Sequence, residues 1–145
     1  MSARKQGPAG RPKIGRMDDG WDKPLAVLLV DDAPAVRAAF TRLLQAEPGV
    51  RVVGGAPDTA GALALIEART PDLVVLDVEL AHGEHGLDLL RRIRVRHPGL
   101  AVIVLSNYGW SAIRAPFLQA GALAYFDKAN QFREAVAWVR DHALA

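Results

Sequence analysis

The stretch "LAVLLVDDAP", residues 25–34, decides the fold predicted for this chain. Six aliphatic residues in a row end in two adjacent carboxylates, Asp31 and Asp32, and Pro34 follows shortly after them. An apolar run of this length is typical of a buried strand, and it usually stops at a Gly, Asn or Pro turn. Two like charges at the end of such a strand therefore indicate a binding site rather than an ordinary turn.

Two later stretches repeat this form. In "LVVLDVE", residues 73–79, an aliphatic run ends in Asp77, and in "AVIVLSN", residues 101–107, another ends in Ser106. Both runs are apolar throughout, as expected for strands that are buried on both faces of a parallel sheet. Together with weaker aliphatic runs, they predict five strands, over residues 25–30, 51–54, 73–76, 101–105 and 123–126.

Segments of helical period lie between and after these runs. Pro34 suits a first helical turn, Asp58 and Asn130 are predicted caps, and Pro116 predicts that the fourth helix is short or begins late. Strands that alternate with helices through right-handed crossovers form a doubly wound α/β fold, a five-stranded parallel sheet with helices on both faces. The helices are predicted over 34–46, 58–69, the segment "HGLDLLRRIRVRHPG" at 85–99, 110–120 and 130–142.

Composition separates a tail from a domain. Residues 1–23 hold six of the 18 Lys and Arg residues, are rich in Gly and Pro and have few aliphatic side chains, which predicts a disordered basic tail. Residues 24–145 are nearly neutral and long enough for one core, which predicts a single domain. The chain has no cysteine, no apolar stretch as long as a membrane span and no signal-peptide core, so we expect a cytoplasmic protein without a membrane contact.

Five polar side chains follow the predicted strands and converge on one edge of the sheet, where ligands bind in this class of fold. Two unit charges ~5 Å apart repel by roughly 3 kcal/mol at an effective dielectric near ~20, so crowded carboxylates need a cation. Oxygen ligands without His or Cys suit Mg²⁺, or Mn²⁺. A carboxylate beside such an ion, a lysine and a hydroxyl is suited to nucleophilic attack on phosphorus. The residues are Asp31 and Asp32 after the first strand, Asp77 after the third, Ser106 after the fourth and Lys128 after the fifth.

From about Leu25 to His142, the chain resembles the receiver domain of two-component response regulators, in its single-domain form. The matching stretches, in order, are "VLLVDDAPAVR", "PDLVVLDVEL", "HGLDLLRRIR", "VIVLSN" and "GALAYFDK". The resemblance implies a flavodoxin-like sheet of strand order 2-1-3-4-5.

The resemblance also implies a role for each polar residue. Asp77 would accept the phosphoryl group, and Lys128 would bind it. Ser106 would hydrogen-bond the phosphoryl group and couple it to Tyr125, the family's switch aromatic. The metal ligands implied are Asp32 directly, Asp31 largely through water, Asp77 and the backbone carbonyl of Glu79.

The chain departs from the family's pattern near this site. Ala81 stands where Pro is usual, in a loop that is one residue longer than usual. Ala129 replaces the common Pro after the site lysine, which puts the usual cis peptide bond there in doubt. Asn107 stands where the family prefers a very small residue, and the bulky Tyr108 follows it. These changes concern pocket access and switching rather than the identity of the phosphoacceptor.

Three further features have two interpretations each. His82 and His85 flank Glu84, and a solvated loop is favoured over a metal site that lacks a third ligand. The arginine-rich run at 91–96 is predicted to be a solvated helix face rather than a nucleic-acid patch. Trp138 lies off the apolar stripe of the last helix, so it is either partner surface or the edge of the core.

The sequence is interpreted as a stand-alone receiver. It would take a phosphoryl group from a histidine kinase or a phosphotransfer protein and signal to a downstream protein by protein–protein contact, without binding nucleic acid. It would not be an enzyme beyond its own Mg²⁺-dependent phosphorylation and dephosphorylation. The alternatives are a phosphorelay intermediate, a phosphate sink and a small Mg²⁺-dependent phosphatase with an aspartyl-phosphate intermediate. The phosphatase is disfavoured because "VDDAP", residues 30–34, lacks the two-residue spacing of its acids, and the intact polar set disfavours a module that is never phosphorylated.

Overall fold

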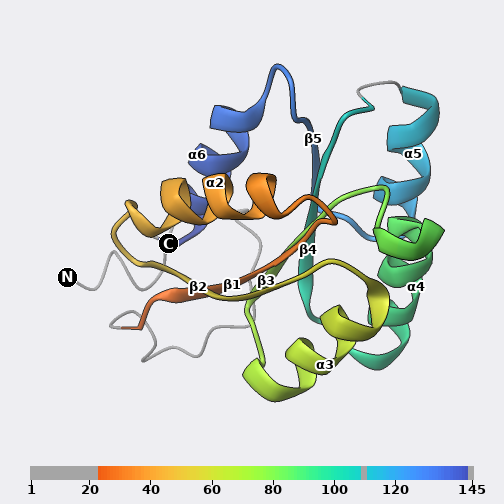
Figure 1. Cartoon of the computed structure of the whole chain (residues 1–145), viewed down its shortest axis with the longest axis horizontal. Helices are drawn as coiled ribbons and strands as arrows, with labels where there is room; N and C mark the ends of the chain where they lie inside the picture. Colours follow the sequence, from red (N-terminus) through yellow and green to blue (C-terminus); the bar gives the residue numbers. More distant parts are fainter. Residues whose placement is uncertain (1–22, 109–110, 144–145) are drawn as a thin grey trace.

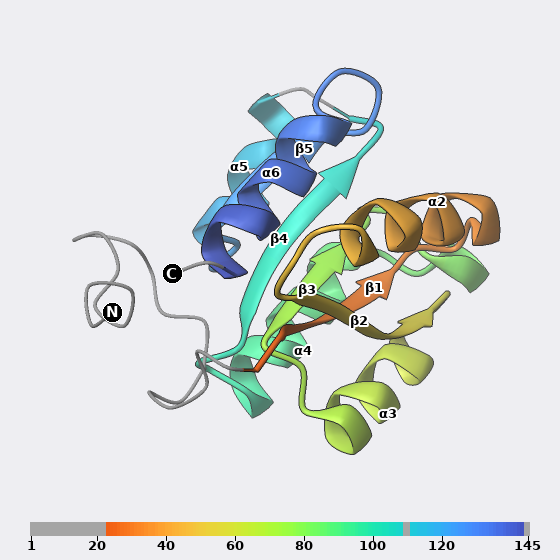
Figure 2. The ribbon, with the colours of Figure 1, turned by 90° about the vertical axis from the view of Figure 1, so that its left-hand side faces the viewer.

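The structure is a computed structural model that describes residues 23–108 and 111–143. It contains a parallel sheet of five strands in the order β2-β1-β3-β4-β5, as predicted. In Figure 2 the arrowheads of β1, β3 and β4 point the same way, so their carboxyl ends share one edge of the sheet. The strands are β1 (Leu25–Val30), β2 (Val50–Ala56), β3 (Leu73–Leu76), β4 (Ala101–Ser106) and β5 (Ala124–Asp127).

Helices cover both faces of this sheet (Figure 1). On one face, α2 and α6 bury a core that includes Phe40 and Val139. On the other face, α3, α4 and α5 bury a second core that includes Ile66 and Phe117. Each side chain of this size contributes roughly 1.5–3 kcal/mol when it is fully buried, so the two cores hold the layers together. The helices are α2 (Pro34–Gln45), α3 (Thr59–Arg69), α4 (Gly86–Arg96), α5 (Ser111–Gln119) and α6 (Phe132–Ala143), with a 3₁₀ turn, η2 (Ala81–Gly83).

Local chemistry explains where two of the helices begin. The Asp58 carboxylate accepts a hydrogen bond of 2.8 Å from the Gly61 N–H and caps α3, as predicted. Pro34 occupies the first turn of α2, where its missing N–H costs nothing. The fourth helix, α5, is short, at nine residues, but it continues through Pro116.

The predicted cap at Asn130 is wrong. Helix α6 begins at Phe132, and the carbonyl of Gln131 accepts its first-turn hydrogen bond from the Ala135 N–H at 3.0 Å. The Asn130 side chain instead donates to the Asp127 carboxylate at 3.0 Å. Asp127 is the last residue of β5, so the end of the strand determines how the Asn130 side chain is used.

Main-chain hydrogen bonds continue past the ends of the strands and hold the polar residues in place. The N–H groups of Asp31, Asp77 and Lys128 donate to carbonyls of neighbouring strands at 3.0, 2.9 and 2.7 Å. Each of these residues is therefore fixed by the sheet although it lies outside a strand. The backbone of these three site residues is thus held by the same kind of hydrogen bonds as the strands themselves.

The structure also bears on the predictions for Trp138, the N-terminal tail and membrane contact. Trp138 is half-buried against the core and stacks on His142 with ring centroids 3.6 Å apart, which places it at the edge of the core. The predicted tail, apart from Lys23, lies outside the described residues. Within the described ranges, no helix has the length and apolar character needed to cross a bilayer.

Gly86, the first residue of α4, makes the closest backbone approach in this part of the fold. Its N–H donates to the Val78 carbonyl at 2.6 Å, and a Cβ on Gly86 would lie 2.1 Å from the Asp77 carbonyl oxygen. Because that oxygen belongs to the backbone, it cannot move aside without shifting the end of β3.

We therefore expect Gly86→Ala to lower the free energy of unfolding by about 1–3 kcal/mol, the usual cost of forcing an extra group into a packed region. Urea unfolding measures this loss. Gly99→Ala is the control, because a Cβ there meets nothing within 4 Å, and it should change stability by less than ~0.5 kcal/mol. Equal stability of the two variants would contradict the prediction.

Candidate functional site

Three carboxylates meet at the carboxyl edge of the sheet, beyond β1 and β3. Asp31 and Asp77 are buried, with 6% and 7% of their surface exposed, whereas Asp32 is exposed. One carboxylate oxygen from each of the three lies within 4.8 Å of the others. The group consists of oxygen ligands only, and its negative charges repel one another. Its residues therefore fit a hard divalent cation such as Mg²⁺, which binds carboxylate oxygens and keeps several waters.

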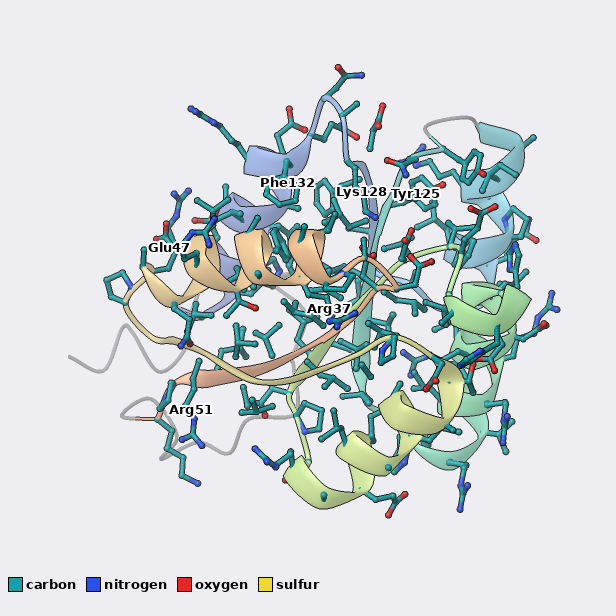
Figure 3. All side chains as sticks on the ribbon, in the orientation of Figure 1. Arg37, Glu47, Arg51, Tyr125, Lys128 and Phe132 are labelled. Atoms are coloured by element: carbon teal, nitrogen blue, oxygen red, sulfur yellow. The ribbon has the colours of Figure 1, made fainter. Side chains whose placement is uncertain are left out.

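Lys128 provides a positive charge among these carboxylates. Its Nζ lies 2.7 Å from Asp31 Oδ2 and 3.0 Å from Asp77 Oδ2, and only 11% of its side chain is exposed. Water therefore screens the two contacts weakly. Figure 3 shows Lys128 and Tyr125 at this end of the sheet, whereas Glu47 and Arg51 lie at the opposite end. One lysine faces three carboxylates, so the site stays negatively charged.

The pKa of Asp77 reflects this crowding. Burial raises it from 3.8 to about 6, Lys128 opposes the rise, and the charge of Asp31 adds to it. Burial by itself lowers the pKa of Lys128, but the hydrogen bonds and charges of Asp31 and Asp77 outweigh burial, so that the net shift is upward. At neutral pH the lysine is charged, and Asp77 carries its negative charge at a cost in stability.

Tyr108 connects the remaining predicted residues. Its N–H donates to Ser106 Oγ at 3.0 Å, and its carbonyl accepts a hydrogen bond from the Tyr125 hydroxyl. Its own hydroxyl donates to Glu79 Oε2 at 2.8 Å, which joins the loop after β4 to the loop after β3. The Glu79 carboxylate raises the pKa of the Tyr108 hydroxyl, and burial raises that of Tyr125. Ser106 also hydrogen-bonds the Tyr125 side chain and lowers its pKa, so the two residues are linked both directly and through the backbone of Tyr108.

Residues 27–140 match the response regulator receiver domain family. The chain belongs to this family. Solved receivers share its fold. A LuxR-family response regulator from Aurantimonas sp. SI85-9A1 has a TM-score of 0.77 and 31% identity, covering 83% of this chain and 86% of that one. The signal receiver domain of NarL from Mycobacterium tuberculosis has a TM-score of 0.74 and 33% identity, covering 83% and 96%. Membership confirms the predicted fold and a place in two-component phosphorelay signalling.

The curated relatives are longer than this receiver. The DNA-binding transcriptional activator DevR/DosR of Mycobacterium tuberculosis is 37% identical over 115 residues, which are 79% of this chain and 52% of that protein. A protein-glutamate methylesterase/protein-glutamine glutaminase of Rhodospirillum rubrum is 38% identical over 85 residues, 59% of this chain and 23% of that protein. The chain thus spans about half of one relative and about a quarter of the other. The stand-alone form therefore stays a prediction.

Some contacts of the receiver site have no signal in the sequence. The Arg37 guanidinium, from α2, donates to the main-chain carbonyl of Asp31. The bulk of Tyr108 is visible in the sequence, but its hydrogen bond to Glu79 is not. The role of the Glu79 backbone carbonyl as a metal ligand also stays a prediction. Among the described residues no peptide bond is cis, including the bond that precedes Ala129.

The histidine-containing loop after β3 is anchored to the neighbouring loop and helix. His82 Nε2 lies 3.2 Å from Asp58 Oδ2, and Glu84 Oε1 accepts a hydrogen bond of 2.7 Å from the Thr59 N–H. The His85 side chain accepts the Leu87 N–H at 3.2 Å and caps the start of α4. These contacts account for the three residues by structural roles, and within the described ranges they belong to no three-ligand metal cluster.

The raised pKa of Asp77 leads to a stability prediction. In EDTA at about pH 7.5, we expect Asp77→Asn to raise the free energy of unfolding by about 1–3 kcal/mol, because the variant no longer buries a charge. A proton that binds with a pKa of about 6 in the folded state and 3.8 in the unfolded state stabilises the wild type as the pH falls. The advantage of the variant should therefore shrink between about pH 7.5 and pH 5.

Urea unfolding at both pH values measures this difference. Asp88→Asn, which changes an exposed carboxylate on α4, is the matched control and should shift stability by less than ~0.5 kcal/mol. If Asp77→Asn were less stable than the wild type at about pH 7.5, the ion pair with Lys128 would outweigh the cost of burial.

Proposed function

We propose that this receiver accepts a phosphoryl group on Asp77 from a histidine kinase or a phosphotransfer protein and passes the signal on by protein–protein contact. The observation that carries the proposal is the placement of Lys128 Nζ between Asp31 and Asp77, with Asp32 beside them. This arrangement places both positive and negative charges around one buried carboxylate, Asp77, at the end of the central strand β3. A stand-alone arrangement and a cytoplasmic location stay predictions.

Asp77 is the carboxylate best placed to act as the nucleophile. Its Oδ1 accepts the Val78 N–H at 2.7 Å and its Oδ2 accepts Lys128, which together fix the orientation of the group. Asp31 is oriented instead by the Ala33 N–H at 2.9 Å, beside the same lysine. In the proposed step an Asp77 oxygen attacks phosphorus, an acyl phosphate forms, and the bond to the donor breaks, with its electron pair leaving on the donor.

The other polar residues prepare the site for this step. Asp31, Asp32, Asp77 and the Glu79 backbone carbonyl would hold Mg²⁺, or Mn²⁺, which neutralises phosphoryl and carboxylate charge when it is bound. Lys128 would turn from the carboxylates to the new phosphoryl oxygens. Its upward-shifted pKa keeps it protonated for that contact.

We also propose that Ser106 and Tyr125 report the phosphoryl group. The Ser106 hydroxyl accepts the Tyr108 N–H and also hydrogen-bonds the Tyr125 hydroxyl, so a turn of Ser106 toward a new phosphoryl oxygen would change both contacts. Tyr108 would follow any movement of Ser106, and the Tyr125 hydroxyl, bonded to the Tyr108 carbonyl, would follow Tyr108. The loop after β4 is in this way the first part of the chain to respond.

The phosphoacceptor assignment is tested by labelling with acetyl phosphate and intact-protein mass spectrometry. Wild type with Mg²⁺ should gain one phosphoryl group that is lost on treatment with base or hydroxylamine, as an acyl phosphate must be. Asp77→Asn, which lacks the nucleophile, should gain none. Asp32→Ala and EDTA-treated wild type should label poorly, because the repulsion between carboxylates and phosphate is then unscreened.

Asp88→Asn is the matched control for the loss of one carboxylate, and it should label like the wild type. A base-stable adduct, or full labelling of Asp77→Asn, would overturn the proposed chemistry. Either result would leave the family assignment and the fold unaffected.

The Ser106→Ala variant tests whether Ser106 takes part in phosphate uptake or only in the response of Tyr108 and Tyr125 to it. Charge neutralisation comes from the metal site and Lys128, so phosphate uptake should stay within about threefold of the wild type. The amide NMR shifts that phosphorylation produces in Tyr108 and Tyr125 should shrink by at least about half, because the hydroxyl sensor is gone. Equal loss of uptake and of shift changes would place Ser106 in the chemistry instead.

A further inference from the structure

An open groove of about 390 Å³ lies between α4 and α5, outside the acidic site. Figure 1 shows these two helices on the face of the sheet that also carries α3. The groove is lined from α4 by Arg91, Arg94 and Val95, and from α5 and the residue after it by Pro116, Gln119 and Ala120.

Half of the residues that line the groove are apolar: Val95, Pro116 and Ala120. Val95 is 82% exposed, the highest value for a large hydrophobic side chain within the described ranges. A single exposed apolar residue is common on protein surfaces. Val95, however, stands in a concave surface opposite Pro116 and Ala120, where a partner's apolar side chain would lose water on both sides.

The border of the groove is basic. Arg91 and Arg94 belong to the lining. Arg91 is exposed, as are Arg92 and Arg96 further round α4, and none of these three forms an ion pair with another described residue. Arg94 is half-buried, and its guanidinium donates to main-chain carbonyls in the loop after α4, including that of Pro98 at 2.8 Å. The lining contains no carboxylate. Asp88 lies one turn earlier on α4 and offsets one of the charges, so the groove keeps a positive excess.

Both walls of the groove are attached to loops of the acidic site. Helix α4 starts at Gly86, whose N–H donates to the Val78 carbonyl next to Asp77. Helix α5 follows the loop that contains Tyr108, and Tyr108 is bonded to Glu79 at the other loop. A partner in the groove would therefore touch the two helices whose beginnings border the site.

We propose that this groove binds an acidic segment of a partner protein, with an apolar side chain of that segment seated against Val95. Charge complementarity to Arg91 and Arg94 in the lining, with Arg92 and Arg96 on the same helix, selects a segment rich in Asp or Glu. Nucleic acid also carries negative charge, but the lining residues include no aromatic side chain for stacking, and Val95, Pro116 and Ala120 among them are apolar. This inference goes beyond phosphorylation and does not depend on it.

The test uses the full, unphosphorylated chain and a fluorescein-labelled helical peptide of about 15 residues built from Glu and Leu, with Leu at helical spacing. A peptide with the same Leu pattern and Lys in place of Glu is the charge control. Fluorescence anisotropy gives Kd, and amide NMR shifts locate the bound peptide. A labelled DNA duplex is titrated in parallel.

Two variants probe the groove, and one controls for net charge. Val95→Glu should weaken binding of the acidic peptide about tenfold or more and Arg91→Glu about fivefold, because each places a negative charge at the groove. Arg51→Glu changes another exposed arginine, at the opposite end of the sheet, and should weaken binding of the acidic peptide less than about twofold. Unchanged thermal unfolding should confirm that all three variants fold.

The proposal would be supported if the acidic peptide changed amide NMR shifts only in α4 and α5 and the Lys peptide did not bind. Three results would overturn it: equal weakening by Arg51→Glu, shifts centred elsewhere, or no binding of the acidic peptide at millimolar concentration. Tighter binding of the duplex than of the peptide, with loss in Arg91→Glu, would assign the groove to nucleic acid instead. None of these outcomes depends on whether Asp77 is phosphorylated.

Discussion

The contact of Lys128 with Asp31 and Asp77 is the interaction on which the rest of the site depends. The two aspartates follow adjacent strands, β1 and β3, whereas the lysine follows β5 at the edge of the sheet. The ammonium group therefore ties the centre of the sheet to its last strand. It also offsets only part of the negative charge of the three carboxylates, which leaves a site suited to a divalent cation and a phosphoryl group.

This arrangement has a cost in stability. Water is largely removed from Asp31 and Asp77, and the pKa of Asp77 rises to about 6 as a consequence. A fold selected for stability alone would replace such a buried carboxylate with a neutral side chain of the same shape. The main-chain hydrogen bonds that extend the sheet past β1, β3 and β5 hold Asp31, Asp77 and Lys128 at its edge, and so keep the buried carboxylates beside one another.

The loops after β3 and β4 connect the site to the surface. Tyr108 bridges them through its hydroxyl, its N–H and its carbonyl, so Glu79, Ser106 and Tyr125 share one residue as a partner. The same loops lead directly into α4 and α5, which form the walls of the basic groove around Val95. The acidic site and the groove are thus connected by short stretches of chain and by the hydrogen bond of Tyr108 to Glu79.

The sequence by itself determined the strands, the alternation with helices and the convergence of Asp31, Asp77, Ser106 and Lys128. These follow from local periodicity and from a rule of topology, since parallel strands must end at one edge. Only the tertiary structure decided which partner each polar group uses. The Asn130 side chain hydrogen-bonds Asp127 at the end of β5 and does not cap α6. The Tyr108 hydroxyl hydrogen-bonds Glu79, 29 residues away along the chain. Such pairings depend on distances between loops packed against each other, and a pattern of residue types along one chain carries no information about those distances.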